Sequence, residues 1–138
     1  MSNELAISSC KEYSLKSLDS SEEWVKDNSV NALSMKLVDQ ARTVVNGAFK
    51  DEHIYPAIAF CGTEELTLYW KANDTSLEID FDEEGFYVAT KWHGEQTAQL
   101  MGDFKDFPYQ TVTEFLDKLT SRVESVNPEW RKLFPTTV

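Results

Sequence analysis

Acidic side chains gather at one point of the chain, in a pattern that gives them a common direction. Glu78, Asp80 and Asp82 alternate with apolar residues, and Glu83 and Glu84 follow directly. Alternation with period two is typical of a strand that has one buried and one outer face. The first three carboxylates therefore project from the same face, with neighbours about 6.5–7 Å apart.

Two kinds of chemistry use carboxylates at such spacing. A glycosidase needs its pair in a cleft with one acid desolvated, and 138 residues is short for building one. An EF-hand calcium loop needs a bidentate Glu six positions after its glycine. Counted from Gly85, that position is Lys91, a cation. We expect no metal site here, and two interpretations stay open: a solvated outer face or a protein-binding face.

Histidine and cysteine add no recognisable catalytic motif. His53 and His93 have no second ligand at metal-binding spacing, and Cys10 and Cys61 have no nearby histidine in the sequence. Phosphate-binding and nucleophile-elbow motifs are also missing from the sequence. We predict no catalytic residue, no cofactor and no enzyme activity. An unrecognised site built on acids and histidines is a third hypothesis.

The net charge of −11 is concentrated in the middle of the chain. Residues 47–92 contain ten acidic and three basic residues, a net charge of −7, whereas the segments on either side each have −2. Nucleic acids and anionic membranes call for the opposite sign. The electrostatic complement is a basic protein.

Alternating and apolar stretches predict an antiparallel meander of four or five strands. The clearest strand spans 77–82; the others cover 57–60, 66–71, 86–92 and, more weakly, 96–101. Gly85 is placed to supply the positive φ of a hairpin turn. Tyr87 and Trp92 lie on the fourth strand, where aromatic side chains on an acidic face can anchor an interface.

Apolar residues at steps of three and four predict two helices, one before and one after the strands. The first spans 29–46, with Asn28 or Ser29 as N-cap and Gly47 beyond its C-terminus. The second follows Pro108 and ends at Asn127-Pro128. Residues 1–28 show no clear period, so we predict a loosely ordered acidic arm with a short helix around 20–26.

These elements predict the α+β class, with an N-terminal and a C-terminal helix packed on one face of the sheet. Residues 29–138 form a single domain, whose core combines inward side chains of both helices and of the strands. No apolar run is long enough to span a bilayer. The first 15 residues lack a signal-peptide pattern, and two distant cysteines form no disulfide framework, so we expect a reduced, cytoplasmic protein.

The central hairpin resembles a pattern found in small uncharacterised bacterial and phage proteins. The matching stretches are 66–70 (LTLYW), 76–80 (SLEID) and 84–87 (EGFY), preceded by a helix and Pro56. The resemblance covers about residues 30–90. Such proteins are loosely associated with toxin–antitoxin or other defence cassettes. The resemblance thus implies an interaction protein and assigns no catalytic residue.

The leading hypothesis is a non-enzymatic acidic protein that binds and neutralises a basic protein, as antitoxins, immunity proteins and anti-defence proteins do. The predicted partner-binding residues are Glu78, Asp80, Asp82, Glu83, Glu84, Tyr87 and Trp92. The alternative is a structural or assembly subunit acting as a homo-oligomer, for example a homodimer that pairs through sheet edges or through Trp130, Leu133 and Phe134.

Overall fold

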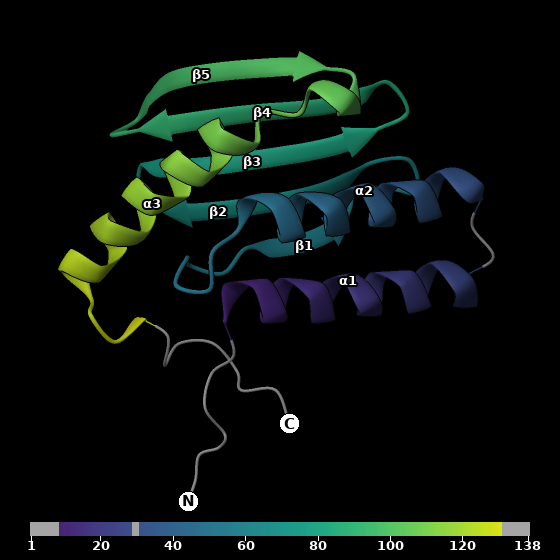
Figure 1. The fold of residues 1–138 in the computed structure, drawn as a ribbon, viewed down its shortest axis with the longest axis horizontal. Coiled ribbons are helices and arrows are strands. Elements are labelled where there is room, and N and C mark those ends of the chain that lie inside the picture. Colours follow the sequence, from purple (N-terminus) through teal and green to yellow (C-terminus); the bar gives the residue numbers. More distant parts are fainter. Residues whose placement is uncertain (1–8, 29–30, 131–138) are drawn as a thin grey trace, which may run out of the picture.

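A computed structural model describes residues 9–28 and 31–130 and confirms the α+β class. Two helices precede the sheet and one follows it (Figure 1). The helices are α1 (Cys10–Asp27), α2 (Ala32–Ala48), the 3₁₀ turn η1 (Phe104–Asp106) and α3 (Tyr109–Val126). The strands are β1 (Ala57–Phe60), β2 (Leu66–Ala72), β3 (Thr75–Asp82), β4 (Gly85–Trp92) and β5 (Glu95–Gly102).

The five strands form one antiparallel meander in the order β1-β2-β3-β4-β5. Leu68 pairs with Ile79, which in turn pairs with Val88, so the apolar faces of three strands coincide. The predicted strands are confirmed, including the weak fifth one. A bulge between Thr90 and Lys91 shifts the register of β5.

The core lies between this apolar face and the helices. The inward side chains of β2 and β3 are buried against α2 and α3, and they share one cluster with Leu37, Val44, Phe115 and Leu119, as predicted. Aromatic contacts connect the layers: Phe49, just after α2, meets Trp70 edge-on at 5.3 Å between ring centroids. Since all helices pack toward one side, the sheet has a covered face and a second, open face (Figure 1).

The prediction of a loosely ordered arm is wrong for the part of it that the structure describes, whereas the short helix predicted around 20–26 is confirmed as part of a longer one. Residues 10–27 form an 18-residue helix, capped by Ser9, which accepts a hydrogen bond from the backbone N–H of Glu12. Its buried stripe includes the small residues Cys10 and Ser14 beside Leu18 and Val25, and small side chains weaken the hydrophobic period. The helix lies beside α2 and against β1 (Figure 1). Residues 1–8 lie outside the described residues.

Two predicted helix boundaries also need correction. Helix α2 is capped by Asn31 instead of Asn28 or Ser29. Asn28 caps the C-terminus of α1, and Ser29 lies outside the described residues. Gly47 lies inside α2, where a Cβ would lie 3.0 Å from the Tyr109 ring, closer than an ordinary van der Waals contact. The predicted end of the last helix before Asn127 is confirmed.

Candidate functional site

The outward side chains of neighbouring strands meet on the open face. Asp80 pairs with Thr67 of β2 on one side and with Tyr87 of β4 on the other. Since side chains directly opposite in antiparallel strands share a face, these three lie together. Tyr87 also pairs with Met101 of β5, which extends the row to the far strand.

At the end of this row the surface is hollowed, with a volume of about 430 Å³. We call this the acidic hollow. It is lined by the five acids Glu65, Asp80, Asp82, Glu84 and Asp103, and by Gly85, Phe86, Tyr87, Met101 and Gly102. The hollow thus combines carboxylates with an aromatic ring and an exposed methionine, two apolar surfaces suited to the stem of a long side chain.

Glycine 85 brings the strands together at this point. Its φ of +137° is a conformation that residues other than glycine rarely adopt. A Cβ at this position would also collide with the carbonyl oxygen of Gly102 on β5. Gly85 pairs with Asp82 across the turn, while the next residue pairs with Gly102. The predicted positive φ at Gly85 is confirmed, and it draws the β3–β4 turn against the end of β5.

Two of the five carboxylates also hold the structure of the hollow. Asp80 is only 6% exposed and accepts a hydrogen bond of 2.6 Å from the Thr67 hydroxyl. Asp82 accepts from the backbone N–H groups of Glu84 and Gly85, at 2.9 and 3.2 Å, and so fixes the turn. These contacts keep both acids in place as the walls of the hollow.

The other three carboxylates, of Glu65, Glu84 and Asp103, have no ion pair within residues 9–28 and 31–130. Burial and the charges of Asp80 and Asp82 raise the pKa of Glu65. Next to the hollow, a hydrogen bond to Asp80, burial, and the charges of Asp80 and Glu65 raise the pKa of Glu78 to about 7. Both shifts indicate a surface with excess negative charge.

Of the seven predicted partner-binding residues, four line the hollow: Asp80, Asp82, Glu84 and Tyr87. Glu78 lies beside it. Glu83 lines an adjacent depression with Lys36 and Gln40 of α2, and this depression shares Asp82, Glu84, Gly85 and Asp103 with the hollow.

Trp92 is on the covered side of the sheet, and its grouping with the acids is wrong. Its ring meets Phe115 of α3 at 5.9 Å between centroids, and the Lys118 ammonium lies 4.7 Å from the ring centre. Trp92 lies five positions after Tyr87, and an odd number of steps along a strand reverses the face.

Sequence reasoning missed Glu65, Asp103 and Met101. Glu65 precedes β2 at even spacing from Thr67 and Tyr69, so its face was readable from the period. Asp103 and Met101 depend on the pairing of β5 with β4, which places Gly102 opposite Phe86. The register of a weak strand leaves no clear signal in the sequence.

The pair formed by His53 and Asp117 connects parts of the fold. His53 is fully buried; its Nδ1 accepts from the backbone N–H of Lys50 at 3.0 Å, and its Nε2 lies 2.8 Å from Asp117. Because Nδ1 accepts, Nε2 carries the proton and donates to the carboxylate. Burial lowers the pKa of His53 despite the neighbouring Asp117. With both ring nitrogens engaged, the pair ties the loop before β1 to α3.

Comparison with protein-family models, with curated proteins and with solved structures finds no match for this chain. The resemblance of the central hairpin therefore stays a prediction. In the described part of the chain, none of the helices has the length and apolar composition needed to cross a membrane. The same residues contain no group of three His, Cys, Asp or Glu side chains arranged to hold a metal ion.

Proposed function

We propose that this protein is a non-enzymatic binding module that receives basic side chains of a protein partner in the acidic hollow. The observation that carries the proposal is the convergence of five carboxylates on one hollow, none of which has an ion-pair partner among the described residues. A lysine or arginine would place its charge among the acids and its apolar stem against Tyr87 and Met101.

The binding would be steered by charge. A net charge of −11 attracts a basic partner over a distance set by the ionic strength, so association is fast at low salt and slows as salt is added. Covering a basic surface that contacts nucleic acid would neutralise the partner. This is the way in which an antitoxin, immunity or anti-defence protein would act here, and the hairpin resemblance supports that class.

A structural role as a homo-oligomer is the second candidate. The outer edge of β5 pairs with no other described strand, and Met101 on it is 71% exposed. Of the tail residues that suggested self-association, Trp130 is buried against Tyr55 with ring centroids 5.3 Å apart. Leu133 and Phe134 lie outside the described residues. Light scattering of the full chain at micromolar concentration separates this candidate from a monomeric binding module.

The structure also decides which carboxylates to change in a test of the hollow. Asp80 and Asp82 hold the sheet and the turn, so their replacement would disturb the fold itself. Glu84 and Asp103 line the hollow without such side-chain bonds in the described residues. The test variant is therefore E84K/D103K. A matched control is E95K/E114K, which changes the net charge equally at the far end of β5 and on the exposed side of α3.

The experiment measures binding of a tri-lysine peptide by NMR, and partner capture from host lysate at low salt. We expect amide shifts centred on residues 65, 80, 84 and 101 that E84K/D103K abolishes and E95K/E114K retains. A partner captured by the parent and by the control, and lost with E84K/D103K, supports the proposal. Equal losses with both variants would show diffuse attraction to net charge and contradict a role for the hollow.

A further inference from the structure

Strand β1 is at the edge of the sheet, and the backbone groups on its outer side pair with no other strand in the described part of the chain. It pairs with β2 along its inner side, and the backbone N–H of Cys61, just after it, donates to the carbonyl of Glu65 at 2.7 Å. In an antiparallel ladder, hydrogen-bonded pairs alternate along the strand. With Cys61 bonded inward, Ala59 and Ala57 are bonded inward too. The N–H and C=O groups of Ile58 and Phe60 therefore point outward.

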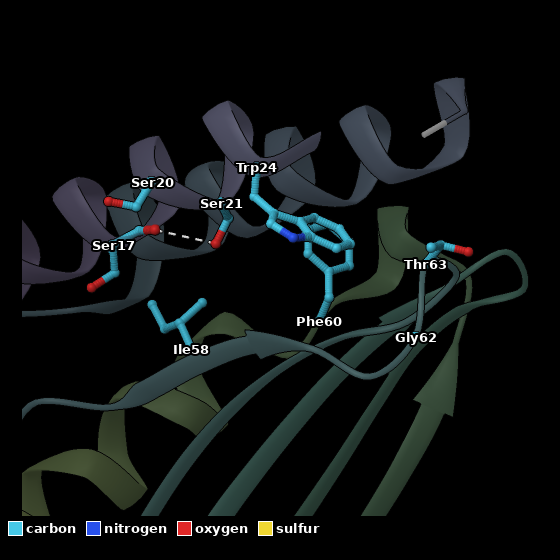
Figure 2. Close-up of a pocket in the computed structure, with 8 residues that line it drawn as sticks. All are labelled: Ser17, Ser20, Ser21, Trp24, Ile58, Phe60, Gly62 and Thr63. Carbon is cyan, nitrogen blue, oxygen red and sulfur yellow. Dashed lines mark hydrogen bonds between the residues drawn. The ribbon is translucent and has the colours of Figure 1, made fainter. Parts of the chain in front are cut away.

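A groove runs along this edge, between β1 and the overlying helix α1 (Figure 2). Its volume is about 680 Å³. The floor is apolar, made by Ile58 and Phe60 of β1, and the 40% exposed Trp24 projects from α1 toward it, with its ring 5.4 Å from that of Phe60 (Figure 2). Hydroxyl groups form the α1 wall and the far end, contributed by Ser17, Ser20, Ser21 and Thr63.

Both walls of the groove are fixed by contacts elsewhere in the fold. On α1, Asp19 and Glu22 pair with Arg42 of α2, and Leu18 and Val25 are buried. On the β1 side, the Ser34 hydroxyl donates to the carbonyl of Thr63 at 2.6 Å, which holds the loop after β1. A groove that is already formed spares the ligand the cost of ordering the protein.

We propose that an extended segment of the basic partner adds to β1 as a sixth strand inside this groove. Its backbone would bond to the outward groups of Ile58 and Phe60. Alternate side chains would be apolar and rest on Trp24 and the two floor residues, the arrangement by which peptides add to an exposed sheet edge.

Acidic residues at one end of the groove indicate where the bound segment would carry a basic residue. The groove ends at Thr63, and Glu64 and Glu65 follow, of which Glu65 also lines the acidic hollow. A basic residue beyond the apolar part of the segment would reach this end. The inference rests on the proposed function for the basic character of the partner, and adds the strand-like segment and its site. A second copy of this chain fits less well, because each copy carries a net charge of −11.

The test uses random-peptide display against the full chain, followed by amide hydrogen exchange with a selected peptide. We expect selected sequences to alternate apolar residues and to carry lysine or arginine at one end. The peptide should slow exchange at the amides of Ile58 and Phe60, which point outward. The amides of Ala57 and Ala59 are already bonded to β2 and should change little.

Matched variants separate the backbone contact from the side-chain contact. I58P and I58A both remove the side chain, but only I58P also removes the outward N–H, without touching the bonds to β2. We expect I58P to bind about fivefold to tenfold more weakly than I58A, the effect of one lost hydrogen bond. S20W, on the exposed wall of α1, should block binding by filling the groove.

The possible failures are distinguishable. If selected peptides respond to E84K/D103K but not to I58P or S20W, the hollow binds and the groove inference is wrong. If they respond to the groove variants but carry no basic residues, the basic partner is contradicted. Protection of Ile58 and Phe60 without peptide would mean that the edge is already occupied and would overturn the inference. Concentration dependence would assign that protection to a second copy, and its absence to another segment of the same chain.

Discussion

Charged side chains on the helical side of the molecule form ion pairs, whereas those that the structure describes on the open face of the sheet do not. Among the helices, Arg42 lies within ion-pair distance of Asp19, Glu22 and Asp39, and Lys50 and Arg122 each face a carboxylate. In the acidic hollow, five carboxylates converge with no lysine or arginine in the described lining. Paired charges of the first kind support the fold. Unpaired charges of the second kind add repulsion to it, which supports the proposal that they bind a partner.

Replacement of His53 should have the largest effect on stability, because this side chain is both hydrogen-bonded and fully buried. Replacement by leucine leaves the Lys50 backbone N–H without its acceptor and removes one of the two partners of Asp117, the other being the Lys50 ammonium. We expect H53L to lower the free energy of unfolding by about 2–4 kcal/mol, the usual range for a broken buried polar network. Urea unfolding measures the change.

The control for His53 is D117N, which keeps an oxygen that can accept from Nε2. It should cost much less than H53L. Equal stability of the two variants would show that the hydrogen bonds of His53 contribute little to the fold. The contrast between the paired groups of the helical side and the unpaired carboxylates of the open face would then lack its main support.

Replacement of Arg42 should have the next largest effect on stability, because its guanidinium lies within ion-pair distance of three carboxylates from two helices. The group is partly exposed, so solvent weakens each pair. We expect R42M to lower Tm by about 3–5 °C, with exchange of α1 amides rising most. K36M, on the exposed side of the same helix, should leave Tm nearly unchanged. Equal Tm values for both variants would show that α1 is held by its buried stripe alone.

The sheet was predictable from sequence because its signal is strong and local. Leu77, Ile79 and Phe81 alternate with acids, and a strand buried on one side must place them inward. Helix α1 was not predictable in the same way: its buried stripe contains Cys10 and Ser14, and its attachment depends on Arg42, more than 20 residues away in the sequence.

The residues of the hollow likewise fall into those that a local sequence pattern predicts and those that depend on pairing between strands. The turn after β3 and the face of Asp80 and Tyr87 follow from period two. The face of Glu65 also follows from that period, whereas Asp103 enters the hollow only because β5 is in register with β4. The groove under α1 was not predicted, since only the stretch around 20–26 of that helix was, and nothing in the sequence placed it against β1.

Glu78 links stability to pH on the open face. Its pKa is about 7 in the fold, above its ordinary value of 4.5, so the folded protein holds the proton more tightly than the unfolded chain. Its contribution to stability is present below pH 4.5 and is lost as the pH rises toward 7. Glutamine mimics the protonated acid, because its amide can donate to Asp80.

We therefore expect E78Q and the parent to have similar Tm values near pH 5, and E78Q to be more stable by a few degrees at pH 8. Using the difference between the two proteins cancels His53, whose lowered pKa changes stability in the opposite direction with pH. A difference that does not change with pH would mean that Glu78 is ionised at both values, and that the open face tolerates its charge.

The smallest effect, and the most direct test of unpaired charge, concerns Glu65. Burial and the charges of Asp80 and Asp82 raise its pKa, which means that the fold disfavours its ionised form at neutral pH. We expect E65Q to raise the free energy of unfolding by about 0.5 kcal/mol at pH 7, while tri-lysine binds more weakly. E64Q, its exposed neighbour outside the hollow, should change neither quantity. A gain in stability together with a loss of binding is the signature of a charge kept for a partner, whereas a loss of both would place Glu65 with the paired charges of the helical side.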